Sequence, residues 1–195
     1  MSNSRATNAK ARVGVLLSGR GSNMMALVQA AEVGAPYTVA LVASDRAEAA
    51  GLTWARERGL DTFALSPKGI GKAAFEAELD AALQAAGVEV IALAGYMRLL
   101  SDAFVGRWRG RILNIHPSLL PKYKGLDTHG RAIAAGDVMA GCSVHLVTEE
   151  LDCGEVLGRA EVPVLPDDDA ASLAQRVLAR EHQLYPNVLS EFVTR

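Results

Sequence analysis

The feature that most constrains this chain is a regular alternation of short apolar runs with helical patterns. Strands buried inside a parallel sheet are typically continuous apolar runs, because helices cover both faces. The predicted strands are residues 12–18, 37–44, 61–66, 88–95 and 111–116, and the predicted helices between them are 22–34, 45–59, 72–87 and 101–108. This order predicts an α/β fold with right-handed crossovers and a doubly wound, mostly parallel sheet.

The pattern loosens after residue 126. We predict a helix at 128–136, a half-exposed alternating strand at 142–148, its hairpin partner at 155–164, and a long C-terminal helix from residue 167 onward. Three aspartates at the start of that last helix are favoured by the helix dipole. No repeat or low-complexity linker divides the chain. We therefore expect a flexible N-terminal tail, residues 1–11, followed by one domain, residues 12–195.

The composition limits the classes of partner. A net charge of -2 gives no electrostatic reason to expect nucleic acid. The two cysteines, Cys142 and Cys153, match neither a disulfide framework nor a metal motif. No apolar run is long enough to span a bilayer, and the polar N-terminus lacks the apolar core of a signal peptide. These features predict a cytoplasmic protein without a metal, membrane or nucleic-acid partner.

Ligands of doubly wound sheets bind outside the carboxyl ends of the strands. The first predicted strand ends in the glycine-rich turn "SGRGSN", which leads into a helix, so its free N–H groups could hold an anion. We interpret it as a site for a single phosphate, held by Gly21, Ser22 and Asn23. A plain tight turn is the simpler alternative.

A dinucleotide site is the rival interpretation of the same turn. Gly19-x-Gly21 begins the dinucleotide fingerprint, and Asp45 ends the second strand. However, the third fingerprint position is Met24, where glycine or alanine would allow close helix packing. Asp45 could also serve as the cap of the helix that follows it.

The fourth predicted strand ends in "AGYMRLL". Met97, Leu99 and Leu100 offer apolar surface beside Arg98, which would suit a flat heterocycle with a polar group. The same pattern also fits residues that simply belong to the core.

The fifth strand ends in "ILNIHPSLLP". Asn114 and His116 are two residues apart in a strand, so both side chains point to the same face. An amide donor beside an imidazole donor suits a developing oxyanion, and Pro117 and Pro121 stiffen the following turn. The segment offers no serine or cysteine nucleophile in a strand-to-helix elbow. A lone histidine here would more often be structural.

Two further polar clusters remain. Ser143 and His145 share one face of their predicted strand, and Asp152 follows in a loop from which a carboxylate could reach an imidazole and hold it charged. A solvated acidic turn is the alternative for Asp152. Glu181 lies on the last helix, facing either the cleft or solvent.

Five stretches together resemble the phosphoribosylglycinamide formyltransferase family: "SGRGSN", "AGYMRLL", "ILNIHPSLLPKYKG", "SVHLVTEELDCG" and "EHQLYP". The resemblance covers residues 12–192. It implies a Rossmann-like formyltransferase fold and transfer of the formyl group of 10-formyltetrahydrofolate to the amine of 5'-phosphoribosylglycinamide, in de novo purine biosynthesis. It further implies direct attack through an oxyanion intermediate, no metal and small-molecule partners. The family includes dimers, so a homodimer is compatible with the sequence.

The resemblance also implies roles for individual residues. The catalytic residues would be Asn114, His116 and Asp152. The nucleotide substrate would contact Gly21, Ser22, Asn23 and Glu181. The folate would contact Lys72, Met97, Arg98, Leu99, Leu100, Asn114, Thr148, Glu149, Glu150, Leu151 and Asp152. The chain departs from the family pattern at Lys72, where an arginine is usual, and at Lys124, where a proline is usual.

Three alternatives stay open. A formyltetrahydrofolate hydrolase would use similar motifs but typically carries an additional N-terminal domain, and a methionyl-tRNA formyltransferase carries an additional C-terminal domain. A nucleotide-binding module without catalysis is the alternative from another class, and it would not need Asn114, His116 and Asp152 to converge.

Overall fold

The computed structural model of the protein describes residues 9–195. The first eight residues of the predicted tail, residues 1–11, therefore lie outside the described residues. Residues 9 and 10 are exposed, and Ala11 already belongs to the first strand.

One seven-stranded sheet organises the molecule, in the order β3-β2-β1-β4-β5-β6-β7. The strands are β1 (Ala11–Leu17), β2 (Tyr37–Ser44), β3 (Thr62–Ala64), β4 (Val90–Leu93), β5 (Ile112–His116), β6 (Met139–Leu146) and β7 (Val156–Pro163). The first five pair in parallel, whereas β6 pairs antiparallel with both β5 and β7. The predicted fold class, a doubly wound and mostly parallel sheet, is confirmed.

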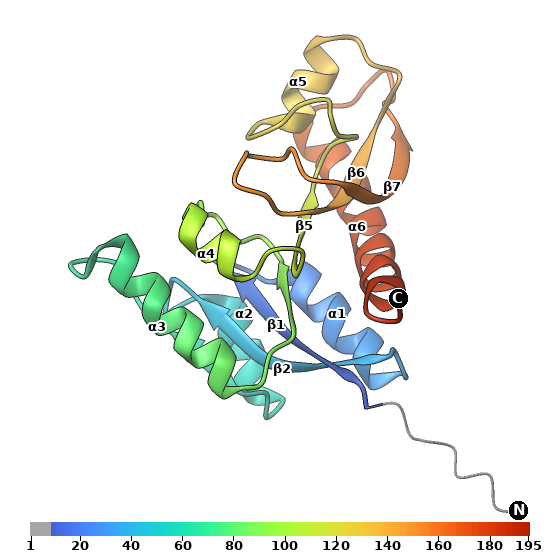
Figure 1. Ribbon diagram of the computed structural model, residues 1–195. Helices are drawn as coiled ribbons and strands as arrows, with labels where there is room; N and C mark the ends of the chain where they lie inside the picture. Colours follow the sequence, from blue (N-terminus) through green and yellow to red (C-terminus); the bar gives the residue numbers. More distant parts are fainter. Residues whose placement is uncertain (1–8) are drawn as a thin grey trace, which may run out of the picture.

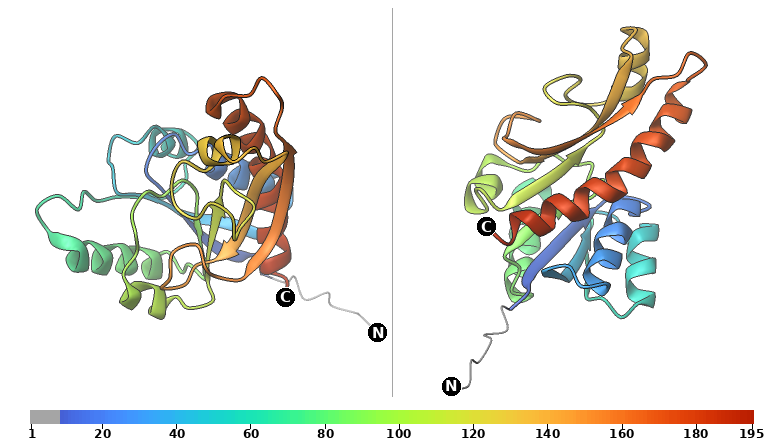
Figure 2. Two further views of the ribbon diagram at one scale, coloured as in Figure 1. Left: turned by 90° about the horizontal axis from the view of Figure 1, so that it is seen from above. Right: turned by 90° about the vertical axis from the view of Figure 1, so that its right-hand side faces the viewer.

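Helices cover both faces of this sheet (Figures 1 and 2). They are α1 (Ser22–Glu32), α2 (Ala50–Glu57), α3 (Gly71–Ala85), α4 (Asp102–Arg107), α5 (Thr128–Ala134) and α6 (Ala170–Phe192). Side chains of α1, α2 and α6 join one buried apolar cluster with the sheet, and those of α3 and α4 join another on the opposite face. The right-hand view of Figure 2 shows α1 and α2 on one side of the sheet and α4 on the other.

Two local predictions were wrong. The predicted half-exposed strand at 142–148 ends at Leu146, and its residues 142–145 are buried on both faces, because α6 packs on one face and the loop after β5 covers the other. The second helix was expected from residue 45, but α2 begins at Ala50, and Ala49 rather than Asp45, the alternative cap, is at the N-cap position. The Ser44 hydroxyl instead accepts the Arg46 N–H (3.1 Å), and this local bond holds the chain in a turn.

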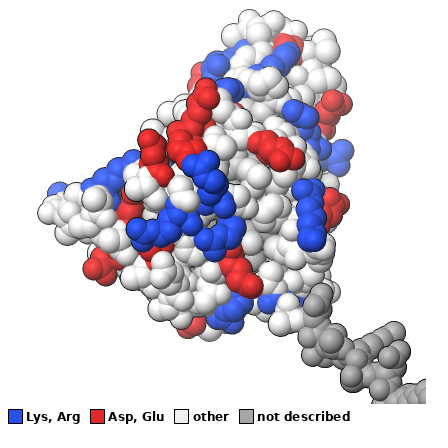
Figure 3. Space-filling model, viewed as in Figure 1, with Lys and Arg blue, Asp and Glu red and all other residues white. Residues whose placement is uncertain are grey.

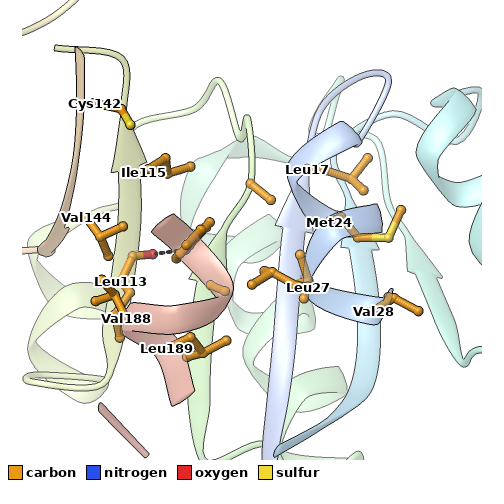
Figure 4. Close-up of a cluster of buried hydrophobic side chains, with 14 of the residues drawn as sticks. Leu17, Met24, Leu27, Val28, Leu113, Ile115, Cys142, Val144, Val188 and Leu189 are labelled. Carbon is orange, nitrogen blue, oxygen red and sulfur yellow. Dashed lines mark hydrogen bonds between the residues drawn. The ribbon is translucent and has the colours of Figure 1, made fainter. Parts of the chain in front are cut away.

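The long helix α6 crosses the middle of the sheet and is anchored there by Tyr185. This side chain is fully buried, and its hydroxyl lies 3.2 Å from the Leu93 carbonyl oxygen and 3.0 Å from that of Leu113, on the neighbouring strands β4 and β5. Figure 4 shows Leu113 and Ile115 of β5 facing the same apolar space as Val188 and Leu189 of α6. The helix is therefore held by apolar packing and by one polar contact to the strands that carry the predicted chemistry.

We predict that Tyr185→Phe lowers the free energy of unfolding by about 1–2 kcal/mol, because the substitution removes a buried hydrogen bond while keeping the ring. Urea unfolding followed by circular dichroism measures this change. Val33→Ala, at a side chain that is 88% exposed, is the control and should change stability by less than about 0.5 kcal/mol. Equal stability of Tyr185→Phe and the wild type would contradict the anchoring role.

Candidate active site

The glycine-rich loop after β1 is hydrogen-bonded to the segment after β4. The Ser18 N–H donates to the Gly95 carbonyl (3.0 Å), and the Met97 N–H donates to the Ser18 hydroxyl (2.9 Å). Ser18 itself is buried. The predicted phosphate loop and the predicted folate-contacting segment are therefore neighbours.

The phosphate loop ends at Gly21, which has the left-handed backbone conformation (φ 76°) and is the N-cap of α1. A Cβ at this position would lie 3.1 Å from the Gly51 Cα, so both the conformation and the space favour glycine. The first backbone bond of the helix runs from Met25 N–H to the Gly21 carbonyl. The N–H groups of Ser22 and Asn23 lie in the first turn, where the helix provides no acceptors, so they remain available to an anion.

The same loop differs from a dinucleotide site. Met24, at the third fingerprint position, is fully buried in the core. The first turn of α2 lies against the loop, since the Gly51 N–H donates to the Gly19 carbonyl (3.1 Å). These contacts favour the single-phosphate interpretation over the dinucleotide one.

Glu181 of α6 lies beside the phosphate loop rather than in solvent. The Asn23 side-chain amide donates to the Glu181 carboxylate (2.7 Å), and both residues are buried. Burial raises the pKa of Glu181, and the hydrogen bond from Asn23 offsets this only in part. A groove of about 480 Å³ opens next to this pair between α1 and α6, and Ser22 and His182 are among its lining residues.

Asn114 and His116 lie on β5, where the parallel part of the sheet meets the antiparallel part. In the β5–β6 register Asn114 is opposite His145, and His116 is opposite Ser143. The Asn114 amide nitrogen lies 3.2 Å from His145 Nε2, while the Ser143 hydroxyl donates to the Ser118 carbonyl (2.7 Å). The two polar pairs predicted on separate strands thus form one cluster.

Asp152 completes this cluster. Its Oδ2 lies 3.5 Å from His116 Nδ1 and its Oδ1 lies 3.5 Å from His145 Nε2, and the Gly125 N–H donates to Oδ2 (2.9 Å). Burial alone would raise the pKa of Asp152, but the hydrogen bonds from His145 and Gly125 and the charge of the histidines lower it below the usual value. The carboxylate is therefore an ionised, buried group, and the solvated-turn alternative is wrong for this residue.

Both ring nitrogens of His116 face acceptors. Nε2 lies 2.9 Å from the Tyr123 carbonyl oxygen, which can only accept a hydrogen bond, so Nε2 carries a proton. Nδ1 lies 3.5 Å from the Asp152 Oδ2 atom, so the carboxylate and the Tyr123 carbonyl together fix the orientation of the ring. In this arrangement Nε2–H is directed at Tyr123, so it must leave that carbonyl before it can donate to a substrate.

The loop that carries Asp152 folds back onto β6. A Cβ at Gly154 would lie 1.8 Å from the Leu146 carbonyl oxygen, so only glycine permits this approach. Asp152 has a positive φ (50°), and the Thr148 hydroxyl donates to the Glu150 carbonyl (3.1 Å). The loop conformation is therefore fixed by its own backbone contacts, and these direct Asp152 inward.

Exposed apolar side chains lie in the segment after β4 and in the loop that carries Asp152. Met97, Leu99 and Leu151 are 64%, 67% and 52% exposed, whereas Leu100 is half-buried against the core. The half-buried Arg98 guanidinium lies 5.5 Å from the centre of the Phe75 ring. Apolar surface beside a fixed cation suits a flat heterocycle that carries a carboxylate.

Charged residues flank the same region. Figure 3 shows Lys and Arg side chains gathered on the face that carries α4. From the turn after α4, Arg109 forms an ion pair with Glu149 (2.5 Å). Lys72, the predicted folate contact, is exposed at the start of α3, and within residues 9–195 no hydrogen bond or ion pair joins it to the other predicted site residues.

Three contributors were not predicted as site residues: His145, Tyr123 and Gly125. His145 had a visible signal, because it repeats the two-residue spacing of Asn114 and His116 on the next strand. The contributions of Tyr123 and Gly125 are backbone atoms, a carbonyl and an N–H, which sequence patterns do not reveal.

Within the described residues, no three His, Cys, Asp or Glu side chains are arranged to hold a metal ion. None of the helices in that part of the chain has the length and apolar character needed to cross a bilayer.

We predict that Glu181→Gln stabilises the protein by about 1 kcal/mol at pH 8, because the wild type keeps a charge in a buried site there. The folded pKa of Glu181 is raised, so wild-type stability increases as pH falls through that pKa, and the advantage of the variant shrinks. Denaturant unfolding of both proteins from pH 8 to pH 4.5 measures the difference. Glu191→Gln, at an exposed position of the same helix, is the matched control and should have the smaller effect.

Comparison with known proteins agrees with this arrangement. The family model described as "Formyl transferase" matches residues 11–189. Phosphoribosylglycinamide formyltransferase of Escherichia coli is 45% identical over 180 residues, which cover 91% of this chain and 85% of that protein. The crystal structure of phosphoribosylglycinamide formyltransferase from Brucella melitensis has a TM-score of 0.91 and 50% identity, covering 95% of this chain and 97% of that one.

A second group of relatives is much longer. The trifunctional purine biosynthetic protein adenosine-3 of Drosophila melanogaster is 45% identical over 186 residues, and the chain spans only 14% of its length. The match nonetheless covers 93% of this chain. Since the family model covers most of the sequence and the fold agrees, the chain belongs to the formyl transferase family.

Proposed function

We propose that the protein transfers the formyl group of 10-formyltetrahydrofolate to the amine of 5'-phosphoribosylglycinamide, a step of de novo purine biosynthesis. The observation that carries the proposal is the convergence of Asn114, His116 and Asp152 at the end of β5, next to the phosphate loop and the apolar surface after β4. The Escherichia coli relative, which the chain matches over most of both lengths, bears the name of this activity. The proposed setting is the cytoplasm, with small molecules as the partners.

The nucleotide substrate would bind through its phosphate to the N–H groups of Gly21, Ser22 and Asn23. Glu181 lies within hydrogen-bond distance of Asn23, so its carboxylate would receive polar groups of the substrate near that loop. A buried carboxylate accepts hydrogen bonds strongly, which suits hydroxyl or amine donors. This pair therefore orients the substrate amine toward β5.

The folate would lie against Met97, Leu99 and Leu151, with Arg98 available to a carboxylate and with the loop from Thr148 to Asp152 beside it. Their exposed apolar area is the feature that fits a flat ring system. As co-substrate, the folate supplies the formyl carbon that the amine attacks. Lys72 keeps the positive charge of the usual arginine without its planar fork, so we assign it at most a charge interaction.

The proposed roles follow from the hydrogen-bond geometry. The Asn114 amide nitrogen lies 3.2 Å from His145 Nε2, and its N–H groups can donate to the oxyanion that develops during attack. An oxyanion is a stronger acceptor than a carbonyl, so His116 Nε2–H would exchange the Tyr123 carbonyl for it. Asp152 orients His116 and can pass the proton that the attacking amine releases to the departing N10 of the folate, which leaves as tetrahydrofolate.

Hydrolysis of the formyl donor is the nearest competing activity, because water could replace the amine. The phosphate loop and the Asn23–Glu181 pair favour transfer, since a hydrolase needs no nucleotide site. A binding module without catalysis would leave no reason for a buried carboxylate between two histidines. Both alternatives remain outcomes of the following experiment.

We predict that the purified protein consumes 10-formyltetrahydrofolate rapidly only when phosphoribosylglycinamide is present. Absorbance of the folate measures the reaction, and a sample without the amine is the control. Equal rates with and without phosphoribosylglycinamide would identify a hydrolase. No reaction in either sample, from protein shown to be folded by circular dichroism, would support the binding module.

We predict that Asn114→Ala and His116→Ala each lower kcat by roughly 10²–10³, the scale for one oxyanion donor. The double variant should lose less than the product of the two losses, because both groups stabilise one charge. Steady-state kinetics of the three variants measures this. Ser118→Ala is the matched control, since its hydroxyl donates to the Lys122 carbonyl rather than to the cluster. Near-normal turnover of either single variant would make that residue structural.

A further inference from the structure

Lys124 and Cys153 are in unusually close contact beside the candidate active site. The Lys124 Nζ atom lies 2.6 Å from the Cys153 Sγ atom. Nitrogen–oxygen hydrogen bonds average about 2.9 Å, and sulfur is a larger atom than oxygen. The separation is therefore too short for an ordinary hydrogen bond to sulfur, whereas one oxygen atom bonded to both atoms would hold them at a distance of this size.

The two residues join the loops that carry the site. Lys124 precedes Gly125, whose N–H donates to the Asp152 carboxylate, and Cys153 directly follows Asp152. Lys124 is exposed and Cys153 is half-buried, so small oxidants in solvent can reach the pair. The other cysteine, Cys142, is fully buried in β6 and has no such access.

We propose that Lys124 and Cys153 form a covalent N–O–S bridge when the protein meets a peroxide. In the first step the thiol is oxidised to a sulfenic acid, and one peroxide molecule is reduced to water. A second peroxide molecule accepts the remaining two electrons, as the Lys124 amine nitrogen bonds to the sulfenic oxygen. The nitrogen and the oxygen each lose one proton. The sum is R–NH2 + R'–SH + 2 H2O2 → R–NH–O–S–R' + 3 H2O.

The bridge closes a ring between residues 124 and 153 and so ties together the two loops around Asp152. Because the two atoms already lie 2.6 Å apart, bridging needs little movement of Gly125 or Asp152. Thiols restore the separate amine and thiol by supplying four electrons and four protons, and the oxygen leaves as water. The pair is therefore a reversible, peroxide-sensitive tether at the edge of the site.

Mass spectrometry of tryptic peptides tests the bridge on full-length protein treated with dilute hydrogen peroxide. Trypsin does not cleave after a bridged Lys124, so residues 123–131 should appear linked to residues 132–159. The linked mass should exceed the sum of the two peptides by one oxygen minus two hydrogens. Fragmentation should place the link on Cys153, and dithiothreitol should release both peptides.

Matched variants separate the bridge from other oxidation products. Cys153→Ser and Lys124→Arg should each abolish the linked species, and Cys142→Ala should keep it. Cys153 carrying only extra oxygen, with Lys124 still cleaved by trypsin, would overturn the proposal. A link without the added oxygen, or a disulfide, would also overturn it.

Thermal unfolding gives a second measurement, because a cross-link that closes a long loop restricts the unfolded chain. The oxidised wild type should melt at least roughly 5 °C above its reduced form. Oxidised Lys124→Arg should show no such increase. A linked protein with an unchanged melting temperature would show that the bridge does not constrain the two loops. The linked peptide is detected without any activity assay, so its absence leaves the proposed formyl transfer untouched.

Discussion

The candidate site depends on one buried anion, the carboxylate of Asp152. A buried charge is costly unless it is paired and hydrogen-bonded. Here one carboxylate oxygen faces His145, and the other faces His116 and accepts the Gly125 N–H. These partners come from β5, β6 and the loop after β5, so all three must be in place before Asp152 can be buried at acceptable cost. The site and the fold of this half of the sheet therefore form together.

The change from parallel to antiparallel pairing brings these partners together. If β6 ran parallel to β5, the carboxyl ends of both strands would lie at the same edge of the sheet. The side chains nearest to Asn114 and His116 at that edge would then come from the loop after β6. Because β6 runs antiparallel, His145 lies within the strand directly opposite Asn114. The turn after β6 then returns Asp152 to the end of β5, at the one place where Gly154 allows the chain to approach Leu146. A rigid strand positions one histidine, and a tightly folded loop positions the acid.

The sequence predicted the features that depend on local patterns. Apolar runs identified β1, β2 and β4. The predicted Ser101 N-cap of α4 is present, since its side chain accepts the Phe104 N–H. Features that depend on distant partners were missed. The alternation around Ser143 was interpreted as one solvent-facing side, but the hydroxyl is buried under Ser118 and Leu120, 25 and 23 residues earlier. Nothing in a local pattern indicates which loop will cover a strand.

The substrate side of the site is linked to the core through α6. Glu181 and Tyr185 are four residues apart and so lie on the same face of this helix. Tyr185 contacts the carbonyl oxygens of β4 and β5, and one turn earlier Glu181 accepts the hydrogen bond from Asn23, 158 positions away in the sequence. Docking of α6 on the sheet thus brings the carboxylate to the phosphate loop. Burial raises the pKa of Glu181, which means that its ionised carboxylate is destabilised in the folded protein. Packing alone would therefore favour a neutral side chain at this position. Such a cost is expected where a polar group is needed for binding rather than for stability.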